Sequence, residues 1–279
     1  MRLNCAGRDL DLSSPVVMGV LNVTPDSFSD GGLFVDVASA LDHAERMIEA
    51  GAAIIDVGGE STRPGAAPVS VDEEIRRILP IVEALVSRGV RVSVDTSKPE
   101  VIRAALAAGV HLVNDVRALQ SPGALEAAAD SSAAICLMHM QGTPGTMQNA
   151  PTYEDVVAEV TDFLKARVDA CLTAGVDRGR LVIDPGFGFG KTLEHNLDLL
   201  RGLPKIAADI GLPILAGLSR KSMLSILTGR AVEERLAGSL ALAFAALDGG
   251  ARIIRCHDVA ETGDVVKVWT ALRGRGGVA

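Results

Sequence analysis

The chain has 279 residues, of which 48% are apolar and 22% are charged, a balance typical of a folded globular protein rather than a disordered one. The formal net charge is −8, and an acidic surface repels phosphate backbones, so the composition argues against a nucleic-acid partner. Only 3% of the residues are aromatic, which leaves few surfaces on which bases could stack.

Cysteine usage and the N-terminal segment indicate the compartment. Cys5, Cys136, Cys171 and Cys256 are far apart and form no C-x-x-C pair, so neither a zinc ribbon nor a disulfide framework is predicted. Residues 1–14 contain aspartates and no apolar run of the kind found in signal peptides. No run of about 18 uncharged apolar residues predicts a membrane span. We therefore expect a cytoplasmic protein with reduced thiols and no membrane partner.

Short apolar runs rich in Val and Ile recur along the chain and are bounded by Gly and Pro. Continuous runs of this kind favour strands that are buried on both faces, as in a parallel sheet. The predicted strands cover residues 15–22, 52–58, 90–96, 111–116, 133–139, 180–185, 213–219 and 251–258.

Amphipathic segments lie between these strands. In 36–50 the apolar residues Val37, Leu41 and Ile48 share one helical face, and Gly51 follows where a C-terminal cap is expected. Further helices are predicted over residues 71–88, 99–108, 122–130, 153–174, 194–210, 232–248 and 259–272.

Strands that alternate with helices predict βαβ units, and eight such units predict an α/β fold of the (β/α)₈ TIM-barrel type. The alternative is an open doubly wound sheet, whose strand order would have to reverse. No linker divides the chain, so residues 15–275 are expected to form one barrel domain. Residues 1–14 precede the first strand and are expected to form a hairpin or plug across the barrel bottom.

Nearly every predicted strand ends in a polar residue. In a barrel these carboxyl ends meet at one mouth, where active sites are built. Capping of the next helix is an alternative for Asp56, Asp115 and Asp258 individually, but caps do not require Arg, Lys or His. The polar strand ends are Asn22, Asp56, Asp95, Asn114, Asp115, His139, Asp184, Ser219, Arg220, Lys221, Arg255, His257 and Asp258.

Hydrogen-bond acceptors and cationic residues are expected on different sides of the predicted barrel. Asp95, Asn114 and Asp184 offer acceptors that suit a planar, donor-rich edge such as a 2-amino-4-oxo heterocycle. Arg255 and His257 end the eighth strand, on the same face, and lie near the first strand. In barrels the loops after strands seven and eight often hold phosphate, so an anion corner is expected there.

Two long loops, 22–32 and 58–65, are rich in Gly and Pro and are expected to cover the mouth. Residues 184–191, DPGFGFGK, match neither a P-loop nor a dinucleotide-binding motif. No motif predicts a tightly bound catalytic metal or a serine nucleophile. We interpret Cys136 and Cys256 as core residues and His139 as part of the pocket wall.

The motifs NVTPDSFSDGG, DVGGESTRPG, VSVDTSKPEV, NDV, CLMHMQGTP, DPGFGFGK, GLSRKSML and R-x-HDV follow one another in order. Together they strongly resemble the dihydropteroate synthase family of folate synthesis, over residues 15–268. The resemblance implies a (β/α)₈ barrel that joins 6-hydroxymethyl-7,8-dihydropterin diphosphate to p-aminobenzoate and releases pyrophosphate with Mg²⁺ present. It also implies inhibition by sulfonamides, which mimic p-aminobenzoate.

The resemblance assigns roles to individual positions. The pterin ring would be held by Asp95, Asn114, Asp184 and Lys221. The diphosphate would be held by Asn22, Thr62, Arg255 and His257, with Asn22 also a ligand of Mg²⁺. The p-aminobenzoate pocket would be shaped by Phe28, Thr62, Arg63, Pro64, Phe189, Ser219 and Ser222. The residues at the reacting centre would be Asp30, Arg63, Lys221 and Arg255. The chain departs from the family in Cys256, which replaces a common Val, and in lacking Ser-Gly after NDV.

Two related functions remain as alternatives: a pterin-dependent methyltransferase barrel and a non-catalytic pterin-binding relative. The methyltransferase would not need the STRPG and SRKS segments, which are intact here, and the non-catalytic relative should have lost loop residues, whereas Asp30, Thr62 and Arg63 are all present. Residues 232–248 are apolar around most of a helix, which indicates burial on more than one side. We therefore expect a homodimer through the late helices, with tight packing of this helix on the barrel as the alternative.

Overall fold

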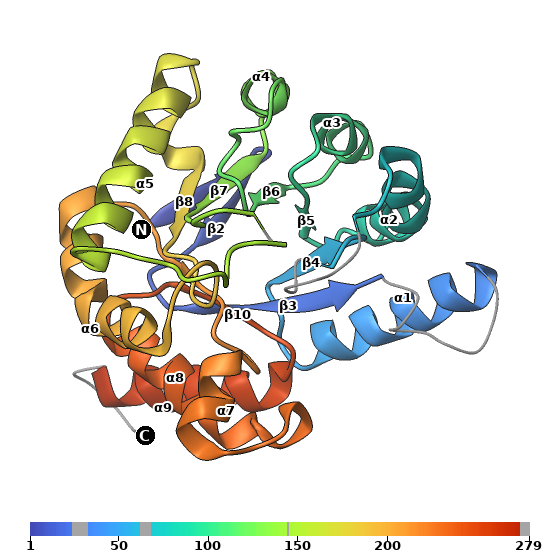
Figure 1. The fold of residues 1–279 in the computed structure, drawn as a ribbon. Coiled ribbons are helices and arrows are strands. Elements are labelled where there is room, and N and C mark those ends of the chain that lie inside the picture. The colour runs from blue at the N-terminus through green and yellow to red at the C-terminus, as the bar shows by residue number, and fades with distance from the viewer. Residues whose placement is uncertain (24–32, 62–67, 144, 274–279) are drawn as a thin grey trace.

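The computed structural model describes residues 1–23, 33–61, 68–143 and 145–273, with the backbone alone for 33–36. Its main sheet has eight parallel strands in the order β8-β7-β6-β5-β4-β3-β10-β9 (Figure 1). The strands are β3 (Val16–Asn22), β4 (Ile54–Gly58), β5 (Val92–Asp95), β6 (Leu112–Asp115), β7 (Ala134–Met138), β8 (Leu181–Asp184), β9 (Leu215–Ala216) and β10 (Ile253–Cys256). Each lies inside a predicted range.

The two edge strands of this sheet meet and close it. A parallel bridge joins Ile183 to Ile214, and the Ile183 amide donates to the Pro213 carbonyl at 3.0 Å. The structure is therefore a (β/α)₈ barrel, as predicted, and the open sheet is excluded. β9 is much shorter than the predicted 213–219, because Pro213 has no amide hydrogen to donate and pairing with β10 stops at Ala216.

Helices surround the strands in Figure 1. They are α1 (Leu33–Glu49), α2 (Val71–Ser87), α3 (Pro99–Ala107), α4 (Ala124–Ala129), α5 (Val156–Thr173), α6 (Leu193–Ile210), α7 (Ser222–Thr228), α8 (Leu236–Asp248) and α9 (Val259–Arg273). Capping by side chains fixes several starts: Ser70 accepts from the Glu73 amide before α2, and Asp155 accepts from two amides before α5. None of the described helices is long and apolar enough to cross a bilayer.

Two helix predictions need correction. α7 was not predicted, because seven residues are too few to show a helical period; Met223 and Leu224 are buried, and Gly229 ends the helix at φ +70°. The predicted helix 232–248 is instead a 3₁₀ turn, Val232–Glu234, followed by α8. The break is at Arg235, whose guanidinium reaches back to the carbonyls of Arg230 and Arg220 at 3.2 and 3.1 Å.

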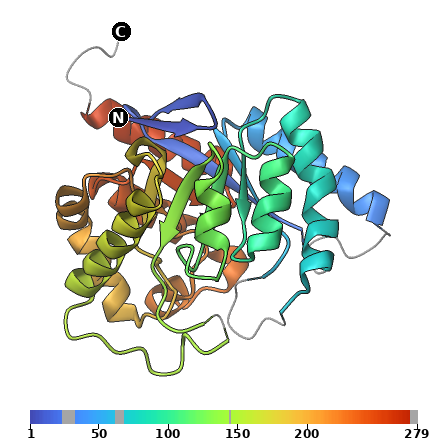
Figure 2. The ribbon, with the colours of Figure 1, turned by 90° about the horizontal axis from the view of Figure 1, so that it is seen from above.

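The core has two parts. The larger one lies between strands and helices, whereas the smaller one fills the barrel interior with residues such as Met18, Ile54 and Leu112. The antiparallel strands β1 (Arg2–Cys5) and β2 (Arg8–Asp11) pack against this inner cluster. Figure 2 shows this hairpin at one end of the barrel, opposite the long connection between β7 and α5. The mouth formed by the strand carboxyl ends is therefore at the other end from the hairpin.

Candidate active site

A pocket opens where the strands end. All four residues that the sequence assigned to the pterin ring contribute to it, together with Arg255 and Phe189. Its lining consists of Asp95, Asn114, Val116, Met138, Asp184, Gly186, Phe187, Phe189, Gly217, Lys221 and Arg255. The barrel thus brings together acceptors from β5, β6 and β8 with cations that follow or end β9 and β10.

Arg255 forms a charged cluster inside the mouth. Its Nε donates to Oδ2 of Asp56 at 2.6 Å, and its Nη2 donates to Oδ2 of Asp95 at 2.7 Å. Asn114 Nδ2 also donates to Oδ2 of Asp56, at 3.0 Å. The expected separation of an anion corner from an acceptor side is therefore wrong for Arg255, which lies between buried carboxylates. Buried carboxylates require a cation, and the guanidinium supplies it.

Burial changes the protonation of three pocket side chains. It raises the pKa of Asp95 to about 7, against the opposing charge of Arg255. Burial likewise raises the pKa of Asp184, although that carboxylate accepts from the Gly186 amide at 2.7 Å. Burial lowers the pKa of Lys221 to about 8. Acid and base groups with pKa values moved toward neutrality are typical of functional sites.

The conformation of the SRKS segment, residues 219–222, directs the side chain of Lys221 into this pocket. Arg220 adopts a left-handed conformation, φ +57°, and its guanidinium pairs with Asp258. Its amide donates to Ser239 Oγ at 2.9 Å, which ties the turn to α8. The ammonium nitrogen of Lys221 then lies 4.2 Å from the centre of the Phe189 ring. Arg220 therefore orients the segment, while Lys221 is the side chain that faces the pocket.

The glycine-rich connection after β8 is held from behind by a buried lysine. Nζ of Lys191 lies 2.9 Å from Nδ1 of His139 and donates to the carbonyls of Gly186 and Phe189 at 2.9 and 3.0 Å. Burial lowers the pKa of Lys191 to about 7 and that of His139 to about 3. The interpretation of His139 as pocket wall is wrong: its ring packs edge-on against Phe163, outside the lining.

Two side chains from the connection between β7 and α5 brace the same loop. Gln148 Nε2 donates to the Gly188 carbonyl at 2.7 Å, and the Tyr153 hydroxyl donates to the Gly190 carbonyl at 2.8 Å. Sequence reasoning missed these two residues and Lys191, because each acts on backbone carbonyls that leave no sequence pattern. Phe189 therefore sits on a loop fixed at several points.

Of the described residues assigned to the diphosphate and to p-aminobenzoate, Arg255 and Phe189 line the pocket, whereas Asn22, Ser219, Ser222 and His257 are not in its lining. Ser219 Oγ lies 3.0 Å from Nδ1 of His257 and also accepts from the His257 amide. Asn22 ends β3 in register with Gly58, and Ser222 begins α7 on the exposed side. The predicted residues Phe28, Asp30, Thr62, Arg63 and Pro64 lie outside the described residues.

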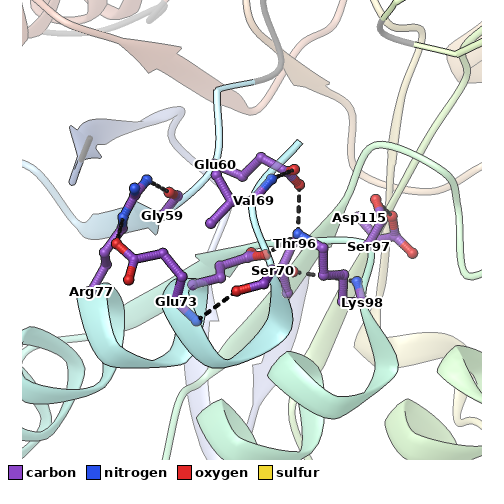
Figure 3. A network of polar contacts seen from close by, with 11 residues as sticks. Gly59, Glu60, Val69, Ser70, Glu73, Arg77, Thr96, Ser97, Lys98 and Asp115 are labelled. Carbon is purple, nitrogen blue, oxygen red and sulfur yellow. Dashed lines mark hydrogen bonds and ion pairs between the residues drawn. The ribbon is translucent and has the colours of Figure 1, made fainter. Parts of the chain in front are cut away.

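Polar contacts tie the chain on both sides of residues 62–67, as Figure 3 shows. Lys98 Nζ donates to Glu60 at 2.9 Å and also pairs with Glu74, which is fully buried. The other oxygen of Glu60 accepts from the Val69 amide at 2.8 Å. Arg77 donates to the Gly59 carbonyl at 2.9 Å. The described ends of this connection are thereby fixed to α2 and to the start of α3.

The capping alternative has a different outcome for each of the three aspartates, and the Asp258 carboxylate pairs with Arg220. Asp56 caps no helix and instead binds Arg255 and Asn114. Asp115 accepts from the amides of Arg117 and Leu119 at 2.7 and 2.9 Å, so it stabilises a turn. Cys136 and Cys256 are buried core residues, as predicted, and burial raises the pKa of both thiols.

Comparison with known proteins identifies this arrangement. A family model described as pterin binding enzyme matches residues 18–257. The dihydropteroate synthase of Escherichia coli (strain K12) is 55% identical over 269 residues, covering 96% of this chain and 95% of that protein.

Solved structures similar to this chain are also dihydropteroate synthases. Dihydropteroate synthase of Xanthomonas albilineans with 4-aminobenzoic acid is 52% identical, with a TM-score of 0.92 and 99% of both chains covered. The Burkholderia cenocepacia dihydropteroate synthase complexed with 7,8-dihydropteroate is 48% identical, with a TM-score of 0.89, covering 98% of this chain and 96% of that one. The resemblance read from the motifs is confirmed: this chain belongs to the pterin-binding enzymes and, within them, to the dihydropteroate synthases.

Proposed function

We propose that this protein is a transferase that condenses 6-hydroxymethyl-7,8-dihydropterin diphosphate with p-aminobenzoate, giving 7,8-dihydropteroate and pyrophosphate. One observation carries the proposal: Asp95, Asn114, Asp184 and Lys221 line a single pocket beside Arg255. The relatives solved with 4-aminobenzoic acid and with 7,8-dihydropteroate support the same substrate and product.

The pterin ring fits the acceptor-rich part of the pocket. Its ring N–H and amino groups donate to the carboxylates of Asp95 and Asp184, while the Asn114 amide can both donate and accept. These donors replace the water that burial removes, so the bound ring stabilises the ionised carboxylates. Lys221 contacts the electron-rich ring from the side of Phe189.

We assign the diphosphate to Arg255, His257, Asn22 and Thr62, and Asn22 would also hold Mg²⁺. The surroundings of Asn22 suit the ion, since its amide oxygen is a hard donor. A Cβ at Gly58 would lie 3.8 Å from that oxygen and 3.5 Å from Cβ of Asp95, so glycine keeps this space open. When bound, Mg²⁺ would neutralise charge that develops on the leaving pyrophosphate.

The reaction we propose is a dissociative displacement at the exocyclic methylene carbon of the pterin. The carbon–oxygen bond to the diphosphate breaks, and pyrophosphate leaves with the electron pair, stabilised by Arg255 and His257. The cation is delocalised into the pterin, beside the negative charges of Asp95 and Asp184. The aniline nitrogen then attacks and loses a proton, and an aniline needs no strong base. Its pocket is assigned to Phe28, Thr62, Arg63, Pro64, Phe189, Ser219 and Ser222, with Asp30 and Arg63 closing over the reacting centre.

The direct test is to incubate purified protein with the pterin diphosphate, Mg²⁺ and p-aminobenzoate and to follow dihydropteroate by mass. Product that disappears when either substrate is omitted, and decreases with added sulfonamide, supports the proposal. Tight binding of the pterin diphosphate without turnover would instead favour a non-catalytic relative. Arg255→Ala should abolish turnover, and normal turnover with normal affinity would contradict the role given to Arg255.

We also propose a cytoplasmic homodimer that uses the late helices. Ile226 and Leu227 on α7 and Val232 after it are large apolar side chains with 67%, 48% and 39% of their surface exposed. Neighbouring apolar residues exposed in this way mark interaction surfaces. Sedimentation equilibrium tests the assembly: a dimer that Ile226→Asp converts to a folded monomer supports the proposal. The buried, unpaired cysteines suit the reducing cytoplasm, which cell fractionation would test.

A further inference from the structure

Asp56 is the one member of the Arg255 cluster to which neither the motifs nor the pocket lining assigns a role. It is the third residue of β4 and is fully buried. Its Oδ2 accepts from Arg255 at 2.6 Å and from Asn114 at 3.0 Å, and both of these partners line the pocket. We propose that Asp56 is a positioning residue that sets the guanidinium of Arg255 and the amide of Asn114 for binding of the pterin diphosphate.

The contact with Asn114 decides which end of the amide faces the substrate. Nδ2 of Asn114 donates to the carboxylate, so the amide oxygen points away from Asp56. A rotated amide would place its oxygen against the carboxylate, where two acceptors repel each other and a buried hydrogen bond is lost. Asp56 therefore presents Asn114 in a single orientation to the ring edge of the pterin.

The contact with Arg255 fixes the plane of the guanidinium. Asp56 accepts a hydrogen bond from Nε and Asp95 accepts one from Nη2. Two edges of the guanidinium are therefore held by residues of two different strands. Without the Asp56 contact, one hydrogen bond to Asp95 would remain, and the guanidinium could rotate around it. Pre-organised donors bind a developing negative charge better than mobile ones, because they need no reorganisation.

The other oxygen of Asp56 indicates that this residue does not serve stability alone. Oδ1 of Asp56 is buried and has no hydrogen-bond partner among the described residues. A buried carboxylate with an unsatisfied oxygen is less stable than well-packed apolar side chains of the same volume. Its contacts to two pocket side chains give a functional reason for a charge at this position.

The experiment compares Asp56→Asn with Glu74→Gln, because Glu74 is equally buried, pairs with Lys98 outside the pocket and also has an unpartnered oxygen. Both variants are checked for folding by circular dichroism and thermal melting. Asp56→Asn should raise the Kd of the pterin diphosphate at least about tenfold, as expected for a lost charged hydrogen bond. Its KM for p-aminobenzoate should stay within about twofold of the parent value, because Asp56 contacts none of the described residues assigned to that substrate. Glu74→Gln should raise the Kd of the pterin diphosphate much less than Asp56→Asn does, because Glu74 contacts Lys98 and no residue of the pocket lining.

A double-mutant cycle with Asn114→Ala tests whether Asp56 acts through its partner. In the Asn114→Ala background, Asp56→Asn should raise the Kd by less than it does in the parent, because only the contact with Arg255 is left to be lost. A folded Asp56→Asn protein with the parent Kd, or fully multiplicative effects in the cycle, would overturn the inference. The inference rests on the proposed function, and parent protein that fails to bind the pterin diphosphate would remove both. If the parent protein binds and converts its substrates, and Asp56→Asn has the same Kd as the parent, the proposed function stands and only the inference about Asp56 is wrong.

Discussion

The ammonium nitrogen of Lys221 lies 4.2 Å from the centre of the Phe189 ring, although the two residues follow different barrel strands. Lys221 is assigned to the pterin and Phe189 to p-aminobenzoate. Their contact therefore makes one wall common to both substrate positions, and a change in Phe189 should affect both.

Phe189→Leu tests this shared wall. Leucine keeps apolar volume but removes the ring face, which for a partly buried cation is worth about 0.5–2 kcal/mol. We expect the KM for p-aminobenzoate and the Kd of the pterin diphosphate each to rise several-fold, with little change in melting temperature. Phe163→Leu is the matched control, since Phe163 packs on His139 away from the pocket. Unchanged binding of both substrates by Phe189→Leu would contradict the shared wall.

Gly186 should tolerate no side chain. Its φ is +70°, and an added Cβ would lie 1.8 Å from the His139 carbonyl oxygen, which is backbone and cannot move aside. Gly175 has a similar φ of +86° but nothing within 4 Å of an added Cβ. Gly175→Ala should therefore cost only the left-handed conformation, about 1–2 kcal/mol. Gly186→Ala should lower the free energy of unfolding, measured with urea, by clearly more than Gly175→Ala does, or should prevent folding. Equal losses of stability in the two variants would refute the steric argument.

The fold could be predicted from the sequence because a parallel barrel repeats one local pattern. Each apolar run between Gly and Pro became a strand, and Asp95, Asn114 and Asp184 met because parallel strands end at the same mouth. The pairing of Asp56 with Arg255 could not be predicted in this way, since it joins positions 199 residues apart. Local periodicity carries no information on such a contact.

The errors in the predicted helices have the same origin. α7 is too short to show a period, and the break before α8 depends on contacts that Arg235 makes with distant carbonyls. Composition alone made residues 232–248 look continuous. In the second case the hydrogen bonds of Arg235 ended the helix, and tertiary contacts of this kind override local propensity.

The contribution of Asp95 to the stability of the protein should fall as pH rises from about 4 to about 7. Burial raises the pKa of Asp95 from 3.8 to about 7, so in this window the folded carboxyl keeps a proton that the unfolded chain has released. The stabilisation is complete below pH 4 and is lost as pH rises through 7. Asp95→Asn removes the titrating carboxyl. The free energy of unfolding, measured with urea at pH 5 and at pH 7.5, should therefore differ less between the two pH values than it does in the parent. An unchanged difference would show that Asp95 does not titrate in this range.

Lys98 should be essential for the stability of α2. Its ammonium pairs with Glu74, which is 0% exposed, and Lys98→Met would leave that carboxylate buried without a cation. Removal of one partner of a buried pair costs about 3–5 kcal/mol. The double variant Lys98→Met with Glu74→Met should recover most of this loss, because no unpaired charge remains. Lys205→Met breaks the surface pair with Asp209 and should leave the urea midpoint near that of the parent. A double variant no more stable than Lys98→Met would show that packing, rather than the unpaired charge, causes the loss.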